Sequence, residues 1–301
     1  MIKKLLCILA VAGLIGCGGH DATINEVEIT TDKYTYSALT AGPEDGTPVI
    51  LLHGFAATAH QYHEVMQVLA TAGYYTIAYT QRGYSAGARP EEVSEYRLEH
   101  TSQDVIDIAD SLGIYRFHLV GHDAGAMVTW AAAARYPDRV ITAAPLSVPH
   151  PRAFIQAFFN PESDQRERSA YSQDFVSPGY ENVLLADDMA WLRDFYSPIR
   201  NDYTETYLEE IGNPEALRAG LKYYHAADWP WNLALGPIVM PTLFIWSTED
   251  LYIAPEGAYA TGDFVEGEYT FDVWENVSHF IPEERPVQLS LMLLQHFHGR
   301  Y

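Results

Sequence analysis

Asp123 stands where a short turn of polypeptide commonly presents a nucleophile to a substrate. It is the centre of the string GHDAG, between Gly121 and Gly125, and this string joins the apolar run FHLV to the helix-like stretch AGAMVTWAAAARY. Such a frame of small residues is typical of a nucleophile elbow, a sharp strand-to-helix turn that usually carries serine at its centre. A carboxylate at this position can attack saturated carbon and form an alkyl ester with the enzyme.

Asp250 and His279, much later in the chain, are suited to the second half of such a reaction, the hydrolysis of the ester. Asp250 follows the apolar run PTLFIW, and His279 lies in the string VSHFIP. Water must attack the aspartyl carbonyl to release the product, and a histidine oriented by a second carboxylate is a common base for that step. The sequence therefore predicts Asp123 as the nucleophile, His279 as the base and Asp250 as the residue that holds the histidine tautomer.

Backbone N–H groups are expected to stabilise the negative charge that develops during this chemistry. Ala124 begins the helix that follows Asp123, and the positive N-terminus of a helix favours an ionised carboxylate. Phe55 follows the HG turn at the end of the strand-like run PVILLHG. The amides of Phe55 and Ala124 are therefore the predicted donors of an oxyanion hole.

Alternating strand-like and helix-like segments must position these residues. The expected strands are residues 48–54, 74–79, 117–121, 140–148, 241–246 and 269–274, after an N-terminal antiparallel hairpin over 26–42. The expected helices are residues 60–73, 97–113, 124–136 and 284–297. This alternation predicts an α/β fold with a mostly parallel sheet covered by helices on both faces. Ligands of such sheets bind at the carboxyl ends of the strands, where Asp123, Asp250 and His279 all fall.

The alternation breaks once, over residues 150–235. This segment holds helical, aromatic-rich pieces and no buried strand, and a structureless loop of that length is improbable in a compact domain. We therefore expect a helical cap, or lid, inserted between two parts of one core, residues 26–149 and 236–301.

The first 25 residues are interpreted as a targeting signal followed by a tether. MIKK supplies positive charge, and LLCILAVAGLIG is apolar but too short to span a membrane. The string LIGC resembles a bacterial lipobox, which predicts a signal peptide over 1–16, a lipidated Cys17 and a tether over 17–25. The protein would then be an exported, membrane-anchored bacterial lipoprotein; if the cell is Gram-negative, it would lie at the outer membrane or in the periplasm. An ordinary secretory signal cut nearby is the alternative.

Composition excludes several other classes of protein. The formal net charge of −22 disfavours binding to nucleic acid or to anionic lipid headgroups. Cys7 and Cys17 are the only cysteines, so the mature chain is expected to hold no disulfide.

His60 and His63 in HQYH could offer two metal ligands one helical turn apart, but no third ligand is apparent. We therefore expect neither a metal nor a cofactor.

The chain resembles α/β-hydrolases of the epoxide hydrolase and haloalkane dehalogenase type, which use an aspartate nucleophile. The resemblance covers about residues 30–298 and rests on the strings LLHGFAATAHQY, QRGYSAGARP, HLVGHDAGAM, SVPHPRAF, IWSTEDLYIAP and VSHFIPEERP. In this family the cap also supplies two tyrosines. RSAYSQDF matches the first cap motif at Tyr171, and GLKYYHAA matches the second at Tyr224. The resemblance implies that these two phenols protonate the oxygen of an opening epoxide.

Departures from the family pattern favour epoxide hydrolysis over dehalogenation. Ala124 replaces a common tryptophan, and Phe55 stands where dehalogenases often carry asparagine; both missing side chains donate N–H groups to a departing halide. The arginine that follows the nucleophile in fluoroacetate dehalogenases is absent too, while Ala56 replaces the proline usual in epoxide hydrolases. We therefore expect an epoxide hydrolase that converts a small apolar epoxide to a vicinal diol. The alternatives are a haloalkane dehalogenase-like enzyme or another α/β-hydrolase, and a non-catalytic, lipid-anchored binding protein.

Overall fold

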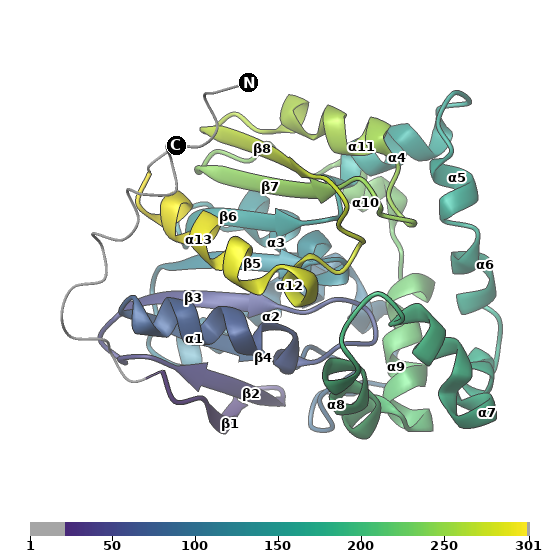
Figure 1. Ribbon diagram of the computed structural model, residues 1–301, viewed down its shortest axis with the longest axis horizontal. Coiled ribbons are helices and arrows are strands. Elements are labelled where there is room, and N and C mark those ends of the chain that lie inside the picture. Colours follow the sequence, from purple (N-terminus) through teal and green to yellow (C-terminus); the bar gives the residue numbers. More distant parts are fainter. Residues whose placement is uncertain (1–21, 300–301) are drawn as a thin grey trace.

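Residues 22–299 are described by a computed structural model (Figure 1). The predicted signal peptide, Cys17 and the first part of the tether lie outside the described residues. Within the described range, no helix combines the length and the apolarity that crossing a lipid bilayer requires.

One mixed sheet forms the centre of the described structure, with the strand order β1-β2-β4-β3-β5-β6-β7-β8. Its strands are β1 (Asn25–Thr30), β2 (Thr35–Ala41), β3 (Thr47–Leu52), β4 (Tyr74–Tyr79), β5 (Phe117–His122), β6 (Val140–Leu146), β7 (Thr242–Ser247) and β8 (Tyr269–Trp274). β1 and β2 form an antiparallel hairpin, β2 is antiparallel to β4, and all the other pairs are parallel. Every residue of β5 and of β7 is buried, as expected for parallel strands covered on both faces.

Helices cover both faces of this sheet (Figure 1). On one face, α1 (His63–Thr71) packs against α13 (Pro286–Phe297), and a buried apolar cluster lies between them and the strands. On the other face, α2 (Leu98–Ser111) packs against α3 (Ala124–Arg135), with α11 (Pro255–Ala260) nearby over a second cluster. The fold class predicted from the sequence, an α/β-hydrolase fold with helices on both faces, is confirmed.

The chain between β6 and β7 is helical and lies at the carboxyl ends of the parallel strands, at the right of Figure 1. We call residues 151–233 the cap. Its helices are α4 (Pro151–Phe159), α5 (Gln165–Arg168), α6 (Tyr171–Phe175), α7 (Tyr180–Phe195), α8 (Asn201–Ile211), α9 (Pro214–His225) and α10 (Trp229–Leu233). A third buried cluster joins cap side chains such as Phe175 and Tyr207 to Phe55 and Phe280 of the core. The cap and the core are therefore packed together directly above the strand ends.

Candidate active site

Asp123 occupies the turn between β5 and α3 in a conformation that few residues adopt. Its φ is 53° and its ψ is −116°, so the backbone is strained in a way that is typical of functional sites. The flanking glycines are required by close approach. A Cβ on Gly121 would lie 2.2 Å from the carbonyl oxygen of Gly125, and one on Gly125 would lie 2.3 Å from that of Leu52. The small-residue frame in the sequence thus reflects a helix packed tightly on the sheet.

The structure brings the three predicted residues of the triad together at the strand ends. His279 Nδ1 lies 2.7 Å from Asp250 Oδ2, and His279 Nε2 lies 3.3 Å from Asp123 Oδ2. Asp250 follows β7, and its other oxygen accepts N–H groups from Tyr252 and Ile253 at 2.8 and 3.0 Å. These two donors hold the Asp250 carboxylate so that Oδ2 faces the imidazole, as a residue that orients a base requires.

The charges of these three groups depend on one another. Burial acts to lower the pKa of His279, but the carboxylates of Asp250 and Asp123 outweigh it and raise the pKa to about 10. Burial likewise acts to raise the pKa of Asp123, but His279 beside it holds that pKa well below its usual range. At neutral pH the ligand-free site therefore contains an ionised Asp123 and a protonated His279.

Of the two predicted oxyanion donors, one already contacts the nucleophile. The Phe55 N–H donates to Asp123 Oδ1 at 2.7 Å. Within the described residues, the Ala124 N–H makes no hydrogen bond with this carboxylate, although Ala124 is the first residue of α3. The Phe55 N–H thus engages Oδ1. The other oxygen, Oδ2, lies nearer the imidazole, and among the described residues no backbone N–H donates to it.

A small cavity beneath the cap contains these groups. It leaves about 10 Å³ of free space, room for about one water molecule. Its lining residues are Phe55, Asp123, Tyr171, Phe175, Trp191, Phe195, Tyr224, Tyr252 and His279. We call this space the inner cavity. The structure thus places Asp123, His279 and both predicted cap tyrosines around one enclosed volume.

The two cap tyrosines come from different helices but meet edge to face. Tyr171 opens α6 and Tyr224 lies near the end of α9, with ring centroids 6.1 Å apart. Burial is the main cause that raises the pKa of both phenols, and the charge of Asp123 raises both further. Each hydroxyl therefore keeps its proton throughout the neutral range and can donate a hydrogen bond.

A buried polar network, which hydrophobic periodicity does not predict, fixes the Phe55 turn. Gln61 accepts the Gly54 N–H at 3.1 Å and donates to Glu283 at 2.8 Å. The same amide lies 3.1 Å from Nδ1 of His122, whose Nε2 lies 2.8 Å from the carbonyl oxygen of His279. Since burial lowers the pKa of His122 to about 4, this imidazole is neutral and can accept at Nδ1 while donating at Nε2. Gln61 thereby connects the turn that carries Phe55 to the backbone of His279, the predicted base.

Cap residues also join this network. The Tyr207 hydroxyl of α8 donates to Glu283 at 3.1 Å, and the Tyr196 hydroxyl donates to the Ala56 carbonyl. On the core side, the Ala56 N–H donates to the Tyr84 hydroxyl at 3.0 Å. The turn that carries Phe55 is therefore held from both sides, by the core and by the cap.

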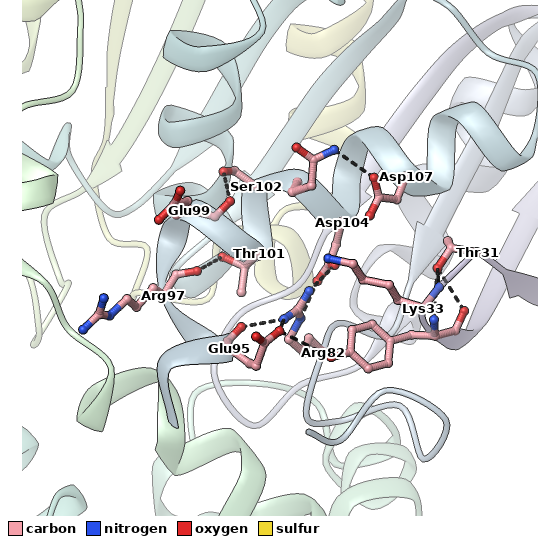
Figure 2. A network of polar contacts seen from close by, with 12 residues as sticks. Thr31, Lys33, Arg82, Glu95, Arg97, Glu99, Thr101, Ser102, Asp104 and Asp107 are labelled. Atoms are coloured by element: carbon pink, nitrogen blue, oxygen red, sulfur yellow. Dashed lines mark hydrogen bonds and ion pairs between the residues drawn. The ribbon is translucent and has the colours of Figure 1, made fainter. Parts of the chain in front are cut away.

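The loop that carries Tyr84 is anchored by a buried arginine. Figure 2 shows Arg82 between Asp104 of α2 and Glu95, and its guanidinium donates to both. The backbone of the same loop bonds to the cap, because the Tyr223 hydroxyl of α9 donates to the Arg82 carbonyl at 2.9 Å. Arg82 thus supports the loop beneath the helix that presents Tyr224.

Other sequence expectations concern the site only indirectly. His60 Nε2 lies 2.9 Å from Glu210 Oε1 of the cap, and the hydrogen bond with this carboxylate raises the pKa of His60. Among the described residues, no group of three or more His, Cys, Asp or Glu side chains is arranged to hold a metal ion.

The cavity residues that the sequence did not single out are Phe175, Trp191, Phe195 and Tyr252. Only their aromatic character was visible, and aromatic residues are frequent throughout the cap.

A comparison with known proteins decides the family. Residues 47–286 match the family model described as alpha/beta hydrolase fold. The chain belongs to the α/β-hydrolase fold family. This α/β-hydrolase is 29% identical over 299 residues to Epoxide hydrolase A of Mycobacterium tuberculosis, a match that covers 85% of this chain and 92% of that relative.

Two further similarities agree with this membership. The α/β-hydrolase is 25% identical over 259 residues to Epoxide hydrolase 4 of Mus musculus, covering 82% of this chain and 72% of that relative. A solved structure of Epoxide Hydrolase A from Mycobacterium thermoresistibile superposes with a TM-score of 0.81 at 24% identity. That superposition covers 92% of this chain and 99% of the other, and it shows the shared fold.

The coupling between Asp123 and His279 can be measured directly. In Asp123→Asn, we expect the pKa of His279 to fall from about 10 by roughly 1–3 units, because one of its two carboxylate neighbours has lost its charge. Titration of the imidazole by NMR provides the measurement. Glu209→Gln, which removes an exposed carboxylate of α8, is the control and should leave the titration unchanged. An unaltered His279 pKa in Asp123→Asn would contradict the coupling.

Proposed function

We propose that this α/β-hydrolase is an epoxide hydrolase, which opens an epoxide to a vicinal diol through an ester between the substrate and Asp123. The observation that carries the proposal is the shared cavity. Asp123, His279, Tyr171 and Tyr224 line one small volume, so a nucleophile, a base and two proton donors face the same point. No cofactor is needed for this chemistry.

Ring opening comes first. Asp123 is ionised before substrate binds, so it needs no base to become nucleophilic. Its Oδ2 attacks a ring carbon, the bond from that carbon to the epoxide oxygen breaks, and a phenol of Tyr171 or Tyr224 gives a proton to the departing oxygen. That oxygen stays attached to the substrate as a hydroxyl group, which explains why a leaving-group cradle is unnecessary.

Hydrolysis of the ester follows. Once Asp123 is esterified, its negative charge is gone and the pKa of His279 falls, so the imidazolium can give its proton to the phenolate left by ring opening and become a base. His279 then takes a proton from a water molecule that attacks the Asp123 carbonyl carbon, and the oxyanion forms at Oδ1, where the Phe55 N–H already donates. Collapse of this intermediate expels the alkoxide, which takes the proton from His279 to give the diol, and the carboxyl group of Asp123 then returns its own proton to His279.

Two other functions fit less of the site. A haloalkane dehalogenase needs donors for the halide ion, and neither Phe55 nor Ala124 has a side-chain N–H group. A binding protein on an inactive scaffold does not require the ordered contacts among Asp123, His279 and Asp250. The relatives named Epoxide hydrolase A and Epoxide hydrolase 4 support the proposed activity.

Removal of the cap hydroxyls tests the proposal. In a Tyr171→Phe, Tyr224→Phe double variant, we expect ring opening to slow by roughly 10²–10⁴-fold, the range for loss of positioned acids. The rate is measured as formation of the alkyl-enzyme with styrene oxide in single-turnover experiments. Tyr180→Phe, a cap tyrosine that does not line the inner cavity, is the matched control.

Each rival gives a different result in the same assays. Wild-type ring opening in the double variant would contradict the role of the two tyrosines. Halide release from a panel of haloalkanes, without diol formation from epoxides, would identify a dehalogenase. Failure of Asp123 to form a covalent ester with any substrate of either class would favour the binding protein.

We further propose that the protein is anchored to a membrane by lipid on Cys17, on the basis of the string LIGC after an apolar run. Cys17→Ser should release the protein from the membrane fraction or leave its signal peptide uncleaved. Cys7→Ser, a change within the apolar run, is the control and should not alter the distribution. Unchanged membrane association of Cys17→Ser, with ordinary cleavage nearby, would refute the proposal.

A further inference from the structure

A larger cavity adjoins the inner cavity on the side of α7. It has a volume of about 210 Å³. We call it the outer cavity; its lining residues are Trp191, Asp194, Phe195, Ser197, Pro198, Glu249, Leu251, Tyr252, Ser278, His279 and Phe280. Trp191, Phe195, Tyr252 and His279 line both cavities. The two spaces are therefore neighbours that share a wall, and that wall includes the predicted base.

The inner cavity alone is too small for a substrate. Its free space of about 10 Å³ accommodates one water molecule, whereas pockets for organic ligands usually measure roughly 300–1,000 Å³. An epoxide carbon must nevertheless come within bonding reach of Asp123. Most of the substrate must therefore lie elsewhere, and the adjacent outer cavity, with about 210 Å³, offers far more room than the inner cavity.

Phe195 is the side chain best placed to divide the two cavities. It is the last residue of α7, and its ring lies 5.5 Å from Trp191 in a stacked arrangement and 5.7 Å from Tyr252. It also lies 6.1 Å from Phe55, the residue whose amide contacts Asp123. A substrate that reaches Asp123 from the outer cavity must pass or displace this ring.

The charged side chains on the outer part of the outer cavity are acidic. Asp194 and Glu249 are exposed carboxylates on its lining, and none of its described lining residues is Lys or Arg. His279 is cationic in the ligand-free site, but Asp123 and Asp250 already pair with it. With a net charge of −22 on the whole chain, an anionic group entering this cavity meets repulsion and no compensating cation.

We propose that the outer cavity binds the non-reacting part of the substrate, with Phe195 as the gate to Asp123. The inference rests on the proposed epoxide hydrolase function and names its substrate class. The enzyme takes epoxides whose remaining group carries no negative charge, and it discriminates against epoxides that carry a carboxylate. Ser197 offers a hydroxyl group to a polar, uncharged remainder, whereas the Ser278 hydroxyl already donates to Glu284.

Matched aryl glycidyl ethers test the charge preference, with 1,2-epoxypropane as a small reference substrate. The three ethers carry a para carboxamide, trimethylammonium or carboxylate group. We expect kcat/KM for the carboxylate to be about tenfold lower than for the carboxamide, from repulsion by two nearby carboxylates. Asp194→Asn with Glu249→Gln should remove most of that difference. Glu209→Gln, which lines neither cavity, is the matched control and should preserve it.

Changes in the shape of the cavities test the gate. Ser197→Trp fills the outer cavity and should lower kcat/KM for the aryl ethers by at least about tenfold, as expected for a blocked pocket, with a smaller effect on 1,2-epoxypropane. Ser177→Trp, at an exposed cap position outside both cavities, is the control.

Phe195→Leu should raise the ratio of kcat/KM for the aryl carboxamide to that for 1,2-epoxypropane. Phe195→Ala should raise the ratio further.

The outcomes separate this inference from the proposed function. If wild-type protein hydrolyses no epoxide, including 1,2-epoxypropane, the proposed function itself fails. If it hydrolyses 1,2-epoxypropane but Ser197→Trp and Phe195→Leu leave the substrate ratio unchanged, the outer cavity is not the substrate site. If the preference for uncharged ethers persists in the Asp194, Glu249 double variant, the charge of the outer cavity does not select the substrate.

Discussion

A protonated imidazole held between two carboxylates is the interaction on which the rest of the site depends. His279 contacts Asp250 at 2.7 Å and Asp123 at 3.3 Å in a buried setting, where an unpaired charge would be costly. The array carries one excess negative charge, which the backbone N–H groups of Phe55, Tyr252 and Ile253 help to stabilise. Any chemistry that neutralises Asp123 changes the proton affinity of His279, so the charge state of Asp123 controls whether His279 can accept a proton.

The cap and the core are coupled through the same few groups. Gln61 and Glu283 join the Phe55 turn to Tyr207 of α8, and Tyr196 at the end of α7 contacts Ala56 in the same turn. The cap thus supplies phenols to the inner cavity and also supports the turn that carries the oxyanion donor. Its helices restrict the space above Asp123 to about the size of a water molecule, which makes substrate access a property of the cap.

The fold and the triad positions were predictable because they follow from local patterns. Continuous apolar runs predicted β5 and β7, and parallel strands must end at one edge, which grouped Asp123, Asp250 and His279. Tyr171 and Tyr224 were identified only through the family motifs. The contact between Gln61 and Glu283 joins positions 222 residues apart and has no signal in hydrophobic periodicity. The aromatic wall between the cavities was equally unpredictable, since it depends on how Trp191 and Phe195 of α7 pack against Tyr252, which follows β7 in the core.

Formation of an ester on Asp123, followed by its hydrolysis, is tested most directly by a single turnover in oxygen-18 water with enzyme in excess of epoxide. We expect the new oxygen of the diol to come from Asp123 and to be unlabelled. The label should instead enter the carboxylate of Asp123, and mass spectrometry of the peptide containing GHDAG locates it. Full labelling of the diol in the first turnover would show that water attacks the epoxide directly, and it would contradict the account.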